Sequence, residues 1–219
     1  FTNNFIVAQN NTDTLTIDSG ITIQGAGNIG NGELTLVNNG IITATLPAGL
    51  VLEPNGNTSL IGFVNNNLMQ ASSNSTLYLQ GGVFTNTNGT IQANDTGTVR
   101  LNNSVTVNSG NFTTAGSGKI ILSVGQTGTI SNGTLTSGSQ FLDENNSTLF
   151  VSGIFTNNGT FTLGAGVNLT DLRIVGNTEF AGNGTFSLSN TTQNRILAAN
   201  GVDTLTVDAG VTIQGAGQF

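Results

Sequence analysis

Asp143 and Glu144 form the only adjacent acidic pair in the chain and are the first residues to test for chemistry. Two carboxylates can act as general acid and general base, or as acid and nucleophile, in the cleavage of glycosidic bonds. Adjacent residues in a strand point to opposite sides of the sheet, however, so these two carboxylates would not converge on one substrate. The chain also has one tyrosine and no tryptophan to stack against a sugar ring. We therefore predict that this chain has no catalytic residue and is not an enzyme.

Other common reaction centres are excluded by the absence of histidine and cysteine. Nucleophilic triads need a general base that is usually histidine, and zinc sites need histidine or cysteine ligands. The best further acidic pair is Asp13 and Asp18, which recurs as Asp203 and Asp208. We interpret these aspartates as turn residues that accept backbone N–H bonds, and calcium binding by scattered oxygens is left open. No metal-ligating residue and no cofactor is predicted.

The charge of the chain argues against two classes of partner. Only 7% of the residues are charged, and the formal net charge is −7. Arg100, Lys119, Arg173 and Arg195 are the only cations, whereas neutralising phosphates requires clustered Lys and Arg. The apolar runs are also far shorter than the roughly 18 residues of a membrane span. We predict neither nucleic-acid binding nor membrane insertion.

A long repeat organises the whole chain. The segment DTLTIDSGITIQGAG at 13–27 returns as DTLTVDAGVTIQGAG at 203–217, with 12 of 15 positions identical and an offset of 190 residues. The three differences are two Ile/Val exchanges and one Ser/Ala exchange, which nearly conserve volume. We interpret residues 1–219 as a single domain that comprises one 190-residue unit of a tandem array and the start of the next, with 1–27 equivalent to 191–217.

A shorter, irregular period lies within this unit. Apolar triplets such as Leu77-Tyr78-Leu79 and Val99-Arg100-Leu101 recur about every 21 residues and are followed by Asn-Gly or Ser-Gly turns. Period-2 alternation without helical periodicity indicates strands, and short repeats of this length are typical of solenoids. We predict an all-β fold, a right-handed single-stranded parallel β-helix (β-solenoid) of about ten coils with phenylalanines in its core. Because Asn-Gly also favours hairpins, an antiparallel β-sandwich is the alternative.

Two of these periods are longer than the others, at 53–75 and 139–147. Extra residues in a coil must leave it as surface loops, and such loops commonly carry function. We therefore predict a contact loop in each segment. The candidate contact residues are Asn65, Asn66, Asn67, Asp143 and Glu144.

The segments NNGTFTLGAGVNLT at 157–170 and SNGTLTSGS at 131–139 resemble the β-strand repeats of large bacterial surface proteins. Filamentous-haemagglutinin-like adhesins and autotransporter passenger regions share this style of sequence, rich in Asn, Gly and Thr. The resemblance covers nearly the whole chain and transfers no functional residue. It implies an extracellular or cell-surface bacterial protein.

The expected function is that of a structural repeat module, a stalk or spacer in a large bacterial surface adhesin or fibre. Its partners would be neighbouring repeats of the same chain, and host or cell-surface glycans or proteins are further candidates. One alternative is a glycan- or cell-surface-binding module that uses the loops at 53–75 and 139–147. Another is a surface-layer or self-assembling filament protein.

Overall fold

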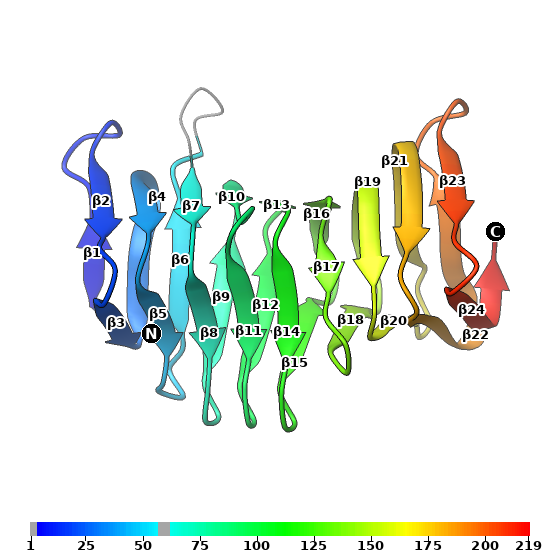
Figure 1. The fold of residues 1–219 in the computed structure, drawn as a ribbon, viewed down its shortest axis with the longest axis horizontal. Helices are drawn as coiled ribbons and strands as arrows, with labels where there is room; N and C mark the ends of the chain where they lie inside the picture. Colours follow the sequence, from blue (N-terminus) through cyan, green and yellow to red (C-terminus); the bar gives the residue numbers. More distant parts are fainter. Residues whose placement is uncertain (1–3, 57–61) are drawn as a thin grey trace.

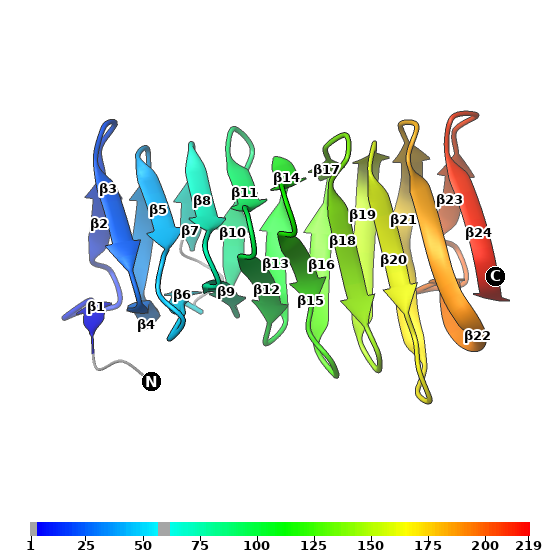
Figure 2. The same ribbon diagram turned by 90° about the horizontal axis from the view of Figure 1, so that it is seen from below.

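The computed structural model describes residues 4–56 and 62–219, and within these ranges every regular element is a β-strand. The strands form one sheet whose pairings are parallel, and the chain winds as a right-handed β-solenoid of about nine coils. The first strands lie at one end of the resulting rod and the last strands at the other (Figures 1 and 2). The predicted fold class is confirmed and the antiparallel β-sandwich is excluded, although the number of coils is about nine rather than ten.

Each coil places one strand on each of three faces that run along the rod. The first face contains β1 (Phe5–Val7), the beginning of β4 (Gly27–Asn38), β6 (Leu50–Pro54), β9 (Thr76–Gln80), β12 (Thr98–Asn102), β15 (Lys119–Leu122), β18 (Gln140–Glu144), β20 (Thr160–Gly164), the beginning of β22 (Thr185–Ala198) and β24 (Thr212–Gln218). The second face contains β2 (Thr14–Ile17), the end of β4, β7 (Phe63–Asn65), β10 (Val83–Thr85), β13 (Val105–Asn108), β16 (Thr127–Ser131), the beginnings of β19 (Thr148–Asn157) and β21 (Thr170–Ala181), and the end of β22. The third face contains β3 (Thr22–Gly25), β5 (Ile41–Ala44), β8 (Leu68–Ala71), β11 (Thr90–Ala93), β14 (Asn111–Thr114), β17 (Thr134–Leu135), the ends of β19 and β21, and β23 (Thr204–Val207).

The coils stack in register, so that inward side chains form columns along the rod. On the first face one column consists almost entirely of leucine, and we call it the leucine column. Its members in order are Leu52, Leu79, Leu101, Leu122, Asp143, Leu163 and Leu188. Because the alternation of strand residues sends every second side chain inward, an apolar triplet in the sequence supplies two core residues and one surface residue.

Eight phenylalanines are fully buried in the core, which confirms the expectation that these aromatic side chains pack inside. Several belong to one run of ring contacts in the later coils. The Phe161 ring stacks on Phe141 with centroids 4.8 Å apart and lies 5.5 Å from Phe186, which in turn stacks on Phe180 at 4.3 Å. These contacts join successive coils, so they stabilise the stacking direction itself.

The turns between faces explain the abundance of glycine and asparagine. Gly110 has a φ of 81°, and an added Cβ there would collide with the carbonyl oxygen of Asn86 in the coil below. Asn103 and Asn132 take positive φ angles of 55° and 53° at other corners. Left-handed backbone of this kind is accessible to Gly and tolerated by Asn, so the composition follows from the many sharp corners of the solenoid.

The two copies of the long repeat do not lie on equivalent faces. Thr14–Ile17 forms β2 on the second face, whereas its counterpart Thr204–Val207 forms β23 on the third face. Likewise Thr22–Gly25 forms β3 on the third face, whereas its counterpart lies in β24 on the first face. The 190-residue offset therefore spans eight coils and about one third of another.

Candidate functional site

Asp143 lies in the core of the solenoid, not on a contact loop. Residues 140–144 form strand β18, and the Asp143 side chain occupies the leucine column between Leu122 and Leu163. Its exposed fraction is 0%. The prediction of a surface loop at 139–147 is therefore wrong, because Phe141, Leu142 and Asp143 fill the same strand positions as the apolar triplets of the neighbouring coils.

Only one of the two oxygen atoms of the Asp143 carboxyl group has a hydrogen-bond partner among the described residues. Ser147 Oγ donates a hydrogen bond to Asp143 Oδ1, whereas Oδ2 has no hydrogen-bond partner among the described residues. Burial raises the pKa of Asp143 well above its usual range; the bond from Ser147 opposes this effect and the negative charge of Asp171 adds to it. Burial in this apolar column thus favours the neutral carboxyl more than water would, and the enclosure of the group prevents contact with any external substrate.

We predict that Asp143→Asn stabilises the protein at neutral pH by about 1 to 3 kcal/mol, since the neutral amide needs neither a buried charge nor the uptake of a proton on folding. The folded pKa lies above the unfolded value of 3.8, so the wild-type carboxyl carries no penalty below that value. The penalty develops as the pH rises from the unfolded pKa to the folded pKa, and it then stays constant. Urea unfolding of both chains between pH 3 and pH 8 should therefore show a stability difference that grows with pH.

The control for this experiment is Asp18→Asn, which changes an exposed carboxyl in a turn. Because this side chain is exposed, the variant should change stability by no more than about 0.5 kcal/mol. A difference between wild type and Asp143→Asn that stays flat across the pH range would contradict the assignment of a raised pKa to Asp143.

Glu144 points to the opposite side of β18 from Asp143, as adjacent strand residues must. Its Oε2 atom lies 3.3 Å from Arg100 Nη1 and accepts a hydrogen bond from the backbone N–H of Val124 at 3.0 Å. Arg100 Nη1 also donates to Ser123 Oγ at 3.0 Å. Glu144 therefore ties together three coils on the surface of the first face. The two carboxylates do not form an acid–base pair.

Asn65 is also buried, at 1% exposed, and belongs to a ladder of three asparagines inside the second face. Asn38 Nδ2 donates to Asn65 Oδ1 at 2.7 Å, and Asn65 Nδ2 donates to Asn86 Oδ1 at 2.7 Å. Asn65 Nδ2 also donates to the carbonyl oxygen of Thr90 at 3.3 Å. This asparagine ladder (Asn38, Asn65 and Asn86) satisfies polar groups at the corner between two faces, so Asn65 is a structural residue.

Asn66 and Asn67 are the two predicted contact residues that remain exposed. They form the turn between β7 and β8, next to the equivalent turn of the coil below. Asn66 Nδ2 donates to Asn39 Oδ1 at 2.8 Å, and Asn67 Nδ2 donates to the carbonyl oxygen of Asn39 at 3.2 Å. The segment 53–75 is therefore not one long loop, because it contains β7 and β8; its residues 57–61 lie outside the described residues.

The structure reveals one cluster of charges that sequence reasoning did not identify. Asp171 is buried on the second face and accepts two hydrogen bonds from Arg195, to Oδ1 and Oδ2, both at 2.7 Å. Arg173 donates two more to Oδ2, at 3.0 and 2.6 Å. Burial alone would raise the pKa of Asp171, but the bonds from Arg195 and Arg173 outweigh it, and the pKa is lowered. The carboxylate is saturated by its partners and serves to join two coils.

Asp171 and Arg195 could have been paired in the sequence only if their strands had been assigned to the same face. They lie opposite each other in the register of β21 and β22, 24 residues apart. The sequence signal is thus a spacing of one coil, which is visible only after the coil boundaries are known.

Two of the four aspartates interpreted as turn residues, Asp13 and Asp203, accept backbone N–H groups with their side chains. Asp13 Oδ2 accepts the backbone N–H groups of Gln9 and Asn10 at 3.0 and 2.9 Å. Asp203 accepts the N–H of Asn200 at 2.6 Å and the N–H of Gly176 at 2.9 Å. Throughout the described residues, no group of three or more acidic, histidine or cysteine side chains is arranged to hold a metal ion.

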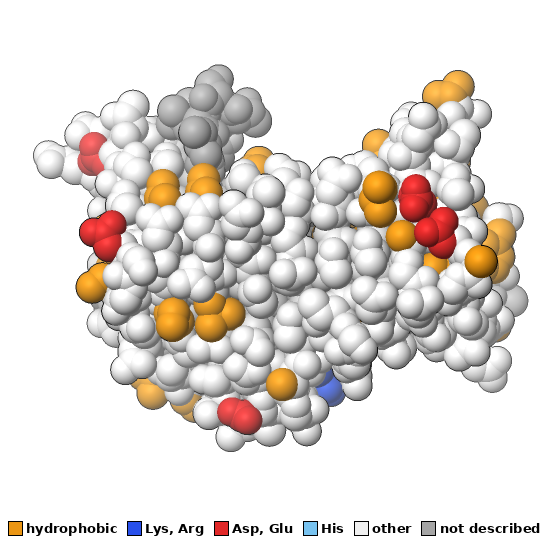
Figure 3. All heavy atoms as spheres, in the orientation of Figure 1, with side chains coloured by type: hydrophobic (Ala, Val, Ile, Leu, Met, Phe, Trp, Pro, Cys, Tyr) orange, Lys and Arg blue, Asp and Glu red, His pale blue; other side chains and the backbone are white. Residues whose placement is uncertain are grey.

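The surface itself is mostly neutral and polar. Figure 3 shows one side of the rod, on which acidic and basic side chains cover only a small part of the surface. The described part of the chain contains no helix long and apolar enough to cross a membrane.

Comparisons with known proteins do not add a relative from which a role could be transferred. No family model matches the chain, and neither the curated proteins nor the solved structures contain a significant match. What the structure shows is a parallel β-solenoid built of repeats.

Proposed function

We propose that this chain is a structural repeat module, a rigid spacer in a large bacterial surface adhesin or fibre. The observation that carries the proposal is that polar and charged side chains form hydrogen bonds and ion pairs between coils. Asn65, Asp171 and Glu144 each bond to residues of adjacent coils and so hold neighbouring coils together. Such side chains make the stack stiff, and stacked coils extend a rod linearly.

The dimensions suit a spacer. Parallel strands lie about 4.8 Å apart, so about nine coils give a rod of roughly 40 Å. The core is continuous from the first coil to the last, because the inward columns contain mainly leucine, isoleucine, valine and phenylalanine. A tandem array of such units would place an attached domain far from the cell surface without a flexible linker.

The glycan-binding alternative is less well supported, because Asp143 and Asn65 are buried and Glu144 is held by Arg100. Only Asn66 and Asn67 of the five predicted contact residues are exposed in a turn. The surface-layer or filament alternative is compatible with a rod but has no observation of its own in this single chain.

The spacer proposal predicts that the purified chain shows no saturable binding on a glycan array or on cultured cells. The test compares the wild type with Asn66→Ala/Asn67→Ala. Asn88→Ala, in the corresponding exposed turn one coil later, is the matched control. Saturable binding that is lost in the double variant and kept in the control would replace the spacer with a binding module.

A further inference from the structure

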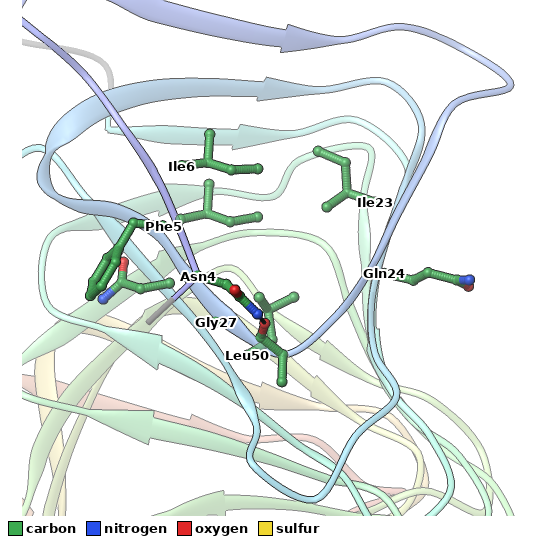
Figure 4. Close-up of a pocket in the computed structure, with 10 residues that line it drawn as sticks. Asn4, Phe5, Ile6, Ile23, Gln24, Gly27 and Leu50 are labelled. Carbon is green, nitrogen blue, oxygen red and sulfur yellow. Dashed lines mark hydrogen bonds between the residues drawn. The ribbon is translucent and has the colours of Figure 1, made fainter. Parts of the chain in front are cut away.

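A hollow of about 480 Å³ lies in the first coils and is lined mainly by apolar residues. Ile6 and Ile23 lie on opposite sides of it, while the Gln24 side chain projects away (Figure 4). None of the residues that line this hollow is charged. Reactive groups therefore lie elsewhere, and in this chain the abundant candidates are the asparagines of the corners.

An asparagine that is followed by glycine can lose its side-chain amide without an enzyme. The backbone nitrogen of the glycine attacks the asparagine Cγ, the bond from Cγ to the amide nitrogen breaks, and ammonia leaves with the proton of the glycine N–H. The product is a cyclic succinimide, which water opens to aspartate or to isoaspartate. Glycine favours the attack because it has no Cβ to hinder the approach. The reaction needs a glycine N–H that is free of hydrogen bonds and an asparagine side chain that can turn back onto it.

The chain contains eight Asn-Gly pairs, and in four of them a hydrogen bond holds the glycine N–H. An N–H that already donates is protected, because the attack would first have to break its bond. The four glycines are Gly40, Gly89, Gly159 and Gly184, with donor–acceptor distances of 3.2, 2.9, 3.0 and 2.7 Å respectively.

Three further pairs are held in other ways. Asn31 and Gly32 lie within strand β4. Asn55 Nδ2 donates to two carbonyl oxygens of the preceding coils. Asn132 Oδ1 accepts the N–H of Ile154 in the next coil at 3.1 Å. Side chains fixed in this way do not turn back onto their own glycine.

The eighth pair, Asn200-Gly201, lacks these constraints. It lies in the corner between β22 and β23, and both residues are exposed. The Gly201 N–H has no hydrogen-bond partner among the described residues, and a Cβ added to Gly201 would meet nothing within 4 Å. The Asn200 side chain bonds only within its own corner, to Asp203 Oδ2 at 3.2 Å. One turn bond, from the N–H of Asp203 to the carbonyl oxygen of Asn200 at 3.1 Å, is all that must break for the peptide unit to rotate.

The first copy of the long repeat shows that a following coil does not close this corner. Residues 10–13 are the counterparts of 200–203, and the N–H of Thr35 in the following coil donates to the carbonyl oxygen of Asp13 at 3.1 Å. Asn10 and Asn11 are nevertheless exposed, and the Asn11 N–H has no hydrogen-bond partner among the described residues. The openness is thus a property of the corner and not of its place in the last coil.

We propose that Asn200 is a site of spontaneous deamidation, at which the Gly201 nitrogen attacks Cγ and the succinimide opens to aspartate or isoaspartate. The new carboxylate forms beside Asp203, whose Oδ2 accepts the N–H of Asn200 at 2.6 Å. Two like charges then share a corner that a single carboxylate organises in the unmodified chain. Isoaspartate also lengthens the backbone of the corner by a methylene group. The modification therefore loosens the connection between β22 and β23 while the core columns stay packed.

Trypsin separates the pairs that the experiment compares, because it cuts after the few basic residues of the chain. The peptide 196–219 contains Asn200-Gly201 as its single Asn-Gly pair, and the peptide 174–195 contains Asn183-Gly184 as its single pair. The folded full-length chain is incubated at neutral pH, then unfolded and digested briefly, and both peptides are measured by mass spectrometry. The mass increase that marks replacement of an amide by a carboxyl group should appear several-fold faster in 196–219 than in 174–195.

Two controls separate the effect of the fold from that of the sequence. The same chain kept unfolded in urea should deamidate the two peptides at similar rates, because both contain an Asn-Gly pair. Gly201→Asn gives the corner the Asn-Asn sequence that its first copy already accommodates at residues 10 and 11. That variant should slow the reaction at Asn200 several-fold and leave the unfolding transition unchanged.

Equal rates for the two peptides of the folded chain would overturn the proposal, as would a difference that persists unchanged in urea. An undiminished rate at Asn200 in Gly201→Asn would also overturn it, since the small size of glycine is what admits the attack. If Gly201→Asn does not fold, the comparison of folded and urea-unfolded wild type decides. The glycan-array test of the spacer proposal measures binding by the unmodified chain, so its outcome is independent of this one.

Discussion

Replacing Phe161 by alanine is expected to lower the free energy of unfolding by about 3 to 5 kcal/mol. The ring is fully buried and contacts Phe141 and Phe155 of the preceding coil and Phe186 of the following coil. Its removal leaves a cavity that the solenoid cannot close, because the hydrogen bonds of the neighbouring strands hold the coils at a fixed spacing. Urea unfolding followed by circular dichroism measures the change.

The matched control is Phe219→Ala, because Phe219 is 74% exposed and lies outside the core. That variant should unfold within about 0.5 kcal/mol of the wild type. Equal losses in the two variants would mean that the phenylalanine contacts do not stabilise the stack of coils.

Replacing Asn65 by alanine is expected to destabilise the protein by about 1 to 3 kcal/mol for each polar group that is left without a partner. One such group arises, because Asn86 Oδ1 loses the donor at 2.7 Å. Asn38 Nδ2 loses the acceptor at 2.7 Å but keeps the carbonyl oxygen of Leu68 at 3.1 Å. Asn65→Asp should also destabilise, since a carboxylate cannot donate to Asn86. Thermal unfolding of the two variants and the wild type measures the effect.

The adjacent Asn66 provides the control, because it is exposed in the same turn. Asn66→Ala should change stability by no more than about 0.5 kcal/mol. If Asn65→Ala changed the free energy of unfolding as little as Asn66→Ala, the asparagine ladder would contribute little to stability. Asn65 would then again be a candidate for a contact with a partner.

The fold class was predictable because the alternation of residues and the frequent Gly and Asn turns reflect local constraints that every coil repeats. The division of each coil into three faces could not be predicted from the sequence. The apolar triplets at 77–79 and 149–151 read as the same feature in the sequence, yet they lie on the first and second faces respectively. Only long-range pairing decides which triplets stack, and no single stretch of sequence contains that information.

Asp143 explains the error about the loop at 139–147. A leucine at this position would have completed the apolar triplet that begins at Phe141 and would have revealed strand β18. The carboxylate instead suggested solvent exposure, since aspartate is rarely buried without a charged partner. The prediction that Asn65 is an exposed contact residue failed in a similar way. A run of three asparagines indicates an exposed turn, whereas the register of the stacked coils places the first of them inside.

The offset between the two copies of the repeat has a consequence for an array of such units. If each unit advances by eight coils and one third of another, successive units are turned about the rod axis by about one third of a revolution. The exposed turn at Asn66 and Asn67 would then point in three directions in succession and return to its first direction in the fourth unit. A long fibre would present that turn along a single spiral with about three units per revolution, so that the copies line up in three rows along the fibre.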